Sequence, residues 1–172
     1  QNNSQLTSIT GFNDLEIVGV SFNVATNKIQ EFSDFNALKS IGGILTFNNN
    51  SELTRITGLN SLVSAYQLVV VNNTALTDIW ALRNINQDTF YSLRITGNAN
   101  LSECSLPNFC TYLSGSGTRT INNNKTGCST VQQIIDNCIT CLEPENLGTT
   151  NLADQTATLV WESDGESFEV EW

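Results

Sequence analysis

The residues that usually carry enzyme chemistry are sparse in this chain, and histidine is absent altogether. Without an imidazole, Ser-His-Asp and Cys-His nucleophile arrangements and the common histidine metal sites are excluded. A pair of carboxylates is still able to hydrolyse a glycosidic bond. The acidic residues, however, fall mostly in predicted turns and form no repeated column: Asp14, Glu16, Asp34, Glu52, Asp78 and Asp88. We interpret them as solvated turn residues and predict a chain that is not an enzyme, with no catalytic residue, no metal site and no cofactor.

The five cysteines all lie between Cys104 and Cys141, and the first hundred residues contain none. Cys138-Ile-Thr-Cys141 is a C-x-x-C pair, but a redox or zinc site needs a second pair or a thioredoxin-like context, and neither is present. Disulfides that brace the end of a repeat array are the alternative, and they require an oxidising compartment. The spacing favours Cys104 with Cys128, which leaves Cys110 with Cys138 and makes Cys141 the odd thiol. Four cysteines allow three connectivities, so the other two pairings stay open.

A recurring asparagine indicates how the chain positions its polar groups. Asn50, Asn73, Asn98 and Asn124 follow one another at nearly equal intervals along the sequence. The chain around the first three fits apolar–x–apolar–x–x–Asn–x–x–Leu, most clearly over residues 68–76. Self-similarity at a period of about 20–50 residues is typical of solenoids and related arrays. An inward amide offers donors and acceptors to the backbone of a turn, so we predict that these four side chains stack in an Asn ladder.

Apolar residues recur in register with the asparagines. The leading column repeats at almost the same interval, and it comprises Leu6, Ile29, Leu53, Leu76 and Leu101. Short alternating stretches such as residues 68–71 predict one strand per repeat, with successive strands paired in parallel. We therefore predict an all-β dominated fold, a parallel β-solenoid with short capping helices. Its outward side chains form one surface, the strand face: Thr46, Asn48, Val69, Val71, Arg94, Thr96, Thr120 and Asn122.

Several apolar and aromatic side chains have two interpretations. Two adjacent outward valines, Val69 and Val71, either contact a partner or lie under a loop and pack against β-branched neighbours. Tyr66, Trp80 and Tyr91 are able to stack on sugar rings, but packing against the edges of the repeats is the favoured interpretation.

The ends of the array depart from the repeat. In the first repeat the strand uses either Val18 and Val20 or Val20 and Phe22 as its inward pair. Near the other end we predict helices over residues 108–113 and 129–137, with Ser129 as N-cap of the second, and a last strand over residues 118–124. Residues 141–147 read as a linker. Two alternating strands follow, over residues 155–161 and 166–172, with a turn at residues 163–165.

The run Leu53-Thr-Arg-Ile-Thr-Gly-Leu-Asn-Ser-Leu62, followed by Leu68, Val70 and Asn73, resembles the receptor L-domain family, whose fold is a leucine-rich-repeat-like β-solenoid. The resemblance covers residues 6–138. The tail from Pro144 through Trp161 to Trp172 resembles the start of a fibronectin type III domain, of which about seven strands would make the whole. These resemblances imply an L-domain-like unit over residues 1–140, with a disulfide-braced cap, and an incomplete fibronectin type III domain over residues 141–172. The arrangement resembles exported surface proteins of Bacteroidetes-type bacteria.

Charge narrows the class of partner. Seven cationic side chains stand against seventeen anionic ones, for a net charge of −10. Nucleic-acid binding draws its affinity largely from Lys and Arg on phosphates, so a nucleic-acid partner is disfavoured, as is adhesion to anionic lipid. No apolar run is long enough to insert into a membrane. We predict an extracellular, secreted or cell-surface recognition or adhesion module that binds a protein or glycan through the strand face. The alternative is an accessory or spacer region of a secreted multidomain enzyme.

Overall fold

A computed structural model describes residues 3–138, 145–153, 156–163 and 166–171. Contacts divide the chain into two compact units, residues 1–138 and 139–172. The predicted linker and turn fall partly, and Cys141 wholly, outside the described residues. The prediction of a mainly β fold with a parallel sheet and few helices is confirmed.

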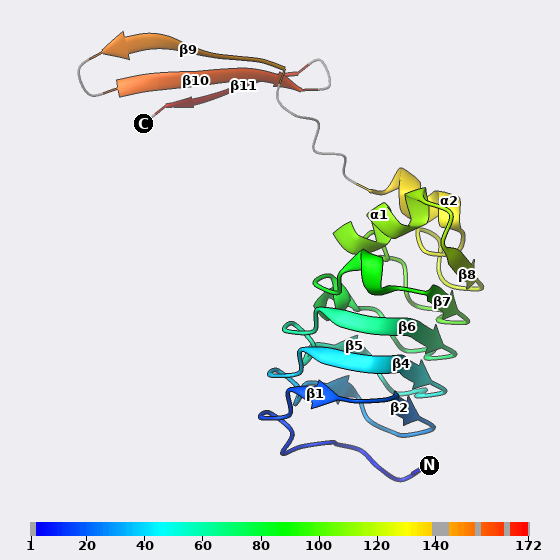
Figure 1. The fold of residues 1–172 in the computed structure, drawn as a ribbon. Helices are drawn as coiled ribbons and strands as arrows, with labels where there is room; N and C mark the ends of the chain where they lie inside the picture. Colours follow the sequence, from blue (N-terminus) through cyan, green and yellow to red (C-terminus); the bar gives the residue numbers. More distant parts are fainter. Residues whose placement is uncertain (1–2, 139–144, 154–155, 164–165, 172) are drawn as a thin grey trace. The chain divides into compact units, whose positions relative to one another are not determined.

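The first unit is built around a six-stranded parallel sheet (Figure 1). Its main path runs β1 (Ile17–Val18), β4 (Ser40–Asn48), β6 (Ser64–Val71), β7 (Ser92–Thr96) and β8 (Thr118–Asn122). Strand β2 (Phe22–Ala25) also pairs with β4. The register advances by one sequence repeat per strand, since Thr46 pairs with Val69, Val69 with Arg94 and Arg94 with Thr120.

The rest of each repeat returns to the start of the next strand through turns and short elements. A two-stranded parallel sheet is formed by β3 (Glu31–Phe32) and β5 (Arg55–Ile56). Two 3₁₀ turns follow, η1 (Trp80–Leu82) and η2 (Gln87–Thr89). Near the C-terminal side of the sheet lie helices α1 (Pro107–Ser114) and α2 (Val131–Asp136), which pack together (Figure 1).

The core lies between the two parallel sheets and consists of the predicted apolar columns. Ile29, Leu53, Leu76 and Leu101 are fully buried, and so are the inward strand residues Leu45, Phe47, Leu68, Val70, Leu93 and Ile95. Burying one such side chain stabilises the fold by about 1.5–3 kcal/mol relative to leaving it exposed. The first repeat is only half covered, because its apolar residues Leu6, Ile9 and Leu15 are partly buried and Phe12 is 45% exposed.

Both predicted inward pairs for the first strand are wrong. Val20 is 76% exposed, and the residues that align with the core positions Leu45 and Phe47 are Phe22 and Val24. The cause is a break in the first strand beside the Gly42–Gly43 pair of β4, where a Cβ on Gly42 would collide with the carbonyl oxygen of Gly19. The register of β4 shifts at the same place, between Ile41 and Ile44, as expected for a β-bulge.

The predicted N-cap of the second helix is also wrong by one residue. Helix α2 begins at Val131, and the Thr130 hydroxyl oxygen accepts from the backbone N–H of Gln133 at 3.1 Å. The Gln133 side chain accepts from the backbone N–H groups of Gly127 and Ser129 at 3.1 and 3.0 Å, which fixes the turn before the helix. Strand β8 ends at Asn122 rather than Asn124, because Asn123 has a left-handed backbone with φ of 56°.

The second unit is described by itself as a three-stranded antiparallel sheet in the order β11-β10-β9. Its strands are β9 (Glu145–Ala153), β10 (Thr156–Ser163) and β11 (Glu166–Glu171). The sequence predicted the second and third of these strands but took the segment of β9 partly as linker.

Candidate functional site

The Asn ladder runs through the interior of the parallel sheet unit. The backbone N–H and the side-chain Nδ2 of Asn50 both donate to Oδ1 of Asn73, at 3.0 and 3.1 Å. Asn73 donates in the same way to Asn98, and Asn98 to Asn124. Asn50, Asn73 and Asn98 are fully buried. Each amide also donates to a strand carbonyl, as Asn73 does to Phe47, so the ladder satisfies backbone groups where the chain leaves the strand.

A residue with a left-handed backbone stands immediately before each of these four asparagines, and also before Asn27, one repeat earlier in the chain. Thr26, Asn49, Asn72 and Asn123 have φ between 55° and 56°, and Gly97 has φ of 72°. Asn and Gly tolerate this conformation better than other residues, which accounts for the Asn-Asn and Gly-Asn pairs in the sequence. Thr26 is a β-branched residue in the same conformation and is strained there.

Sequence reasoning missed a fifth member of the ladder, Asn27. Its backbone N–H and Nδ2 donate to Oδ1 of Asn50 at 3.1 and 3.3 Å. Asn27 lies one repeat before Asn50, which could have indicated its role. The sequence around it does not fit the apolar–x–apolar–x–x–Asn–x–x–Leu pattern, because the column residue Ile29 follows the asparagine one position too early. Oδ1 of Asn27 has no hydrogen-bond partner in the described chain, although the residue is only 7% exposed.

Two disulfides stand at the C-terminal end of the sheet. The structure joins Cys104 to Cys128 and Cys110 to Cys138, with Cα–Cα distances of 5.4 and 5.8 Å. This is the pairing that the spacing favours. Cys104 and Cys128 are fully buried among the apolar side chains of the core, whereas the second bridge ties α1 to the residues after α2.

The strand face consists of two rows of side chains in register across neighbouring strands. One row runs through Asn23, Thr46, Val69, Arg94 and Thr120, and the other through Ala25, Asn48, Val71, Thr96 and Asn122. Adjacent strands are about 4.8 Å apart, so each row presents a side chain at that interval. The structure thus brings all eight predicted residues onto one sheet surface.

Exposure differs along these rows. Arg94, Thr120 and Asn122 are exposed, and the residues of β4 and β6 are half-buried. Thr96 is only 7% exposed and offers little to a partner. Arg94 is the single charged residue in the two rows, so the face is mostly neutral and polar around a β-branched centre.

The three aromatic side chains do pack on the surface, yet about half of each remains exposed. Tyr66 and Tyr91, from consecutive repeats, stack with ring centroids 5.1 Å apart and an interplanar angle of 12°. They are 50% and 58% exposed. The Trp80 ring is 53% exposed, and the guanidinium of Arg83 lies 5.2 Å from its centroid.

The acidic residues behave as surface turn residues. Glu16 pairs with Lys39 at 3.0 Å, a carboxylate oxygen of Asp34 accepts from the Gly11 backbone at 3.0 Å, and Asp78 accepts from the Trp80 backbone at 2.8 Å. Within the described residues, no group of three or more His, Cys, Asp or Glu side chains is placed to hold a metal ion. None of the described helices is long and apolar enough to cross a membrane.

Comparison of the chain with protein-family models, curated proteins and solved structures finds no match.

Proposed function

We propose that this chain is a non-catalytic, extracellular recognition or adhesion module that binds a protein or glycan through its strand face. The proposal takes residues 6–138 as a receptor L-domain-like β-solenoid and the three-stranded sheet as the start of a fibronectin type III domain. The parallel strands with their one-repeat register support the first assignment. The antiparallel order of β9 to β11 is compatible with the second.

The observation that carries the function is the double row of outward side chains on adjoining strands. Repeat proteins commonly present an extended binding surface of this kind, since equivalent positions in successive repeats line up. Half-buried Val69 and Val71 give an apolar centre, and Arg94 adds a single charge beside it. The two disulfides accord with an exported protein, since such bonds persist in oxidising compartments.

The test is a glycan array together with a pull-down from the extracellular proteins of the source, both using the intact chain. Each partner found is measured again against a triple variant, Val69→Thr, Val71→Thr and Arg94→Gln, which keeps β-branched residues in the strands. The control is Val63→Thr with Lys28→Gln, which alters an exposed valine and an exposed cation off the strand face. We expect the triple variant to weaken binding by at least about tenfold and the control to leave it unchanged. If the unaltered chain, the triple variant and the control variant bind each partner equally well, the proposal is contradicted.

A further inference from the structure

A cavity of about 520 Å³ lies away from the strand face, where the turns of two consecutive repeats meet. One wall comes from residues 77–80 and the other from residues 102–106, with Asn137 at the edge. None of these residues belongs to the six-stranded sheet. The volume falls in the range of ordinary small-ligand sites, about 300–1,000 Å³.

The cavity carries two carboxylates and no cationic side chain. Asp78 and Glu103 both line it, and no Lys or Arg is among its lining residues. The two acids are separated by the same interval as Asn73 and Asn98, so they take equivalent positions in successive repeats. Within residues 3–138, Glu103 forms no ion pair with a lysine or arginine side chain.

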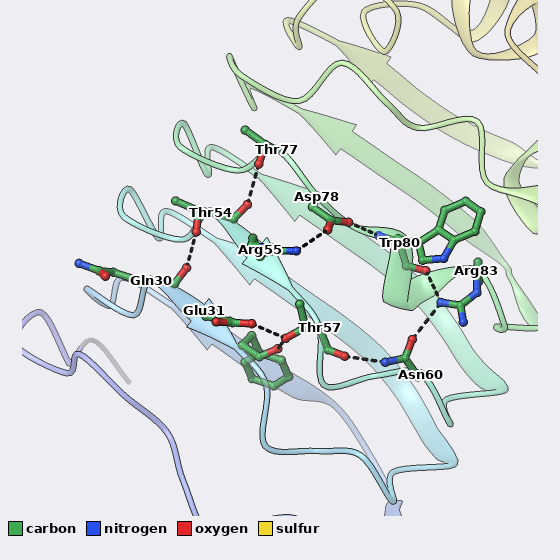
Figure 2. A network of polar contacts seen from close by, with 11 residues as sticks. Gln30, Glu31, Thr54, Arg55, Thr57, Asn60, Thr77, Asp78, Trp80 and Arg83 are labelled. Carbon is green, nitrogen blue, oxygen red and sulfur yellow. Dashed lines mark hydrogen bonds and ion pairs between the residues drawn. The ribbon is translucent and has the colours of Figure 1, made fainter.

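The preceding repeats show what normally stands beside such an acid. Arg55 is the strand partner of Glu31 on one side and forms a bridge with Asp78 on the other, and its guanidinium lies 3.7 Å from the Asp78 carboxylate. Figure 2 shows Glu31, Arg55 and Asp78 following one another in this order. Charges therefore alternate along this row of equivalent positions, from Glu31 to Arg55 to Asp78, but the next position is a second acid, Glu103. A cation bound between Asp78 and Glu103 would restore the alternation.

Hydrogen bonding inside the cavity favours a donor-rich ligand. The Ser105 hydroxyl already donates to the carbonyl of Ile134 at 3.0 Å, and the Thr77 hydroxyl donates to the carbonyl of Thr54 at 3.2 Å. These two groups keep acceptor lone pairs, as do the two carboxylates. The indole N–H of Trp80, the hydroxyl of Ser102 and one N–H of the Asn137 amide are the lining side-chain donors that have no hydrogen bond to another described residue, so acceptors and negative charge predominate.

An exposed tryptophan in the wall selects the kind of cation. Trp80 is 53% exposed, and a guanidinium, that of Arg83, already lies over its ring at 5.2 Å. Arg83 is held there by its donation to the Asn60 side chain at 2.9 Å and to the Trp80 carbonyl at 3.1 Å (Figure 2). A planar guanidinium stacks on an indole and donates two parallel N–H groups to a carboxylate, which an ammonium does less well. A metal ion fits poorly, because no third His, Cys, Asp or Glu side chain of the described residues joins Asp78 and Glu103 to hold one.

We propose that this cavity binds the arginine side chain of a partner protein, with the guanidinium between Asp78 and Glu103 and against Trp80. The cavity is larger than one side chain, so it has room for the backbone that flanks the arginine. This site is independent of the strand face, and its failure or success leaves the strand-face test unaffected.

The experiment is a titration of the intact ¹⁵N-labelled chain with two blocked tripeptides, Gly-Arg-Gly and its neutral counterpart in which citrulline replaces arginine. The indole N–H signal of Trp80, assigned by its loss in Trp80→Phe, reports on the cavity. We expect a saturable shift of this signal with the arginine peptide, with a Kd in the millimolar range, and a much smaller shift with the citrulline peptide. Salt at about 1 M should weaken the binding, because it screens the charges.

Charge variants distinguish binding in the cavity from a general attraction of the peptide to the negatively charged chain. Glu103→Gln should raise the Kd of the arginine peptide by about fivefold. The double variant with Asp78→Asn, whose side-chain oxygen is still able to accept from the Trp80 backbone, should abolish the shift. The matched control is Glu52→Gln, which removes one charge at an exposed position outside the cavity and should leave the Kd unchanged. Unchanged signals elsewhere in the spectrum show that each variant is folded.

Three results overturn the proposal. The first is no shift of the Trp80 indole signal at about 10 mM arginine peptide, which places the Kd far above the millimolar range. The second is equal binding of the citrulline peptide or an equal loss of affinity in Glu52→Gln. The third is a shift produced by a neutral monosaccharide and absent with the arginine peptide, which would make the cavity a sugar site.

Discussion

The two ends of the parallel sheet are completed in different ways. At the C-terminal end, the last ladder residue, Asn124, donates to the carbonyls of Ile95 and Cys128 at 2.8 and 2.9 Å. Helices α1 and α2 and two disulfides stand beside it. At the N-terminal end, Asn27 keeps a buried amide oxygen without a described partner, and Phe12 and Val20 are exposed.

The difference teaches that a repeat of this chain is complete only when it has neighbours on both sides. The interior residue Asn73 donates to the amide oxygen of Asn98 and accepts from Asn50, and its column residue Leu76 is fully buried. The equivalent groups of the first repeats have one neighbour and are half covered. The same substitution should therefore lower the free energy of unfolding by different amounts in the interior and at the N-terminal end.

The largest expected effect is at the interior of the ladder. Asn73→Leu leaves the buried N–H and Nδ2 of Asn50 and the carbonyl of Phe47 without their partner, at about 1–3 kcal/mol for each unpaired group. We expect a loss of about 3–5 kcal/mol in the free energy of unfolding, measured by urea denaturation. Asn27→Leu removes an oxygen that had no partner and should cost less than half as much. Equal losses would show that the two ends do not differ as described.

Next in size is the loss of the buried disulfide. Cys104→Ala with Cys128→Ala should lower the free energy of unfolding by about 2–4 kcal/mol, because the unfolded chain regains the freedom of the closed loop. The readout is the urea midpoint under non-reducing conditions. The control is Cys110→Ala with Cys138→Ala, which opens a similar loop but leaves the fully buried Cys104–Cys128 bridge intact. Its loss in free energy of unfolding should therefore be smaller. The opposite order would contradict the role given to Cys104 and Cys128 as core residues.

Thr26→Gly should raise stability, in contrast to most substitutions. Thr26 is held at φ of 55°, a conformation that costs a β-branched residue about 1–2 kcal/mol. Glycine relieves most of this strain, so we expect a gain of about 0.5–1 kcal/mol in thermal or urea unfolding. Thr46→Gly, in the extended strand β4, is the matched control and should destabilise the chain. A loss in both variants would show that Thr26 is not strained.

The smallest effect concerns Tyr112, whose hydroxyl donates to the carbonyl of Thr118 at 2.8 Å. Burial raises its pKa above the ordinary value of 10.0, and Arg119 opposes this in part. Since the folded pKa is raised, the contribution to stability is present below pH 10 and falls as pH rises toward the folded pKa. Unfolding measured between pH 8 and about 11 should show this fall in the wild type and a shallower one in Tyr112→Phe. Identical slopes would exclude a folded-state shift.

Much of the interior was predictable because the repeats impose it. The interval between the asparagines reappears as the strand register, and the apolar columns reappear as the core. The register of the first strand was not predictable, since it depends on how closely the backbones of Gly19 and Gly42 approach each other. The helix cap differed by one residue because Ser129 and Thr130 are equally suited by type.

The candidate arginine site was visible in the sequence only in part. Asp78 and Glu103 are one repeat apart, so their proximity followed from the period. What the spacing did not contain is that the turns leave a cavity there, or that the Ser105 and Thr77 hydroxyls donate their protons to backbone carbonyls. Those depend on the packing of α2 and on the path of each turn.

The amides of the ladder all point the same way along the stack. In each bond between two members of the ladder, the N-terminal Asn donates and the amide oxygen of the C-terminal Asn accepts, so the ladder has a polarity, like a row of aligned dipoles. At the C-terminal end, the backbone carbonyl of Cys128 accepts from the Nδ2 group of Asn124, where the interior members donate to a further asparagine. Lengthening by design would therefore succeed at the N-terminal side, where a new turn can donate to Oδ1 of Asn27. Shortening from that side would always leave one free amide oxygen, whatever number of repeats is kept.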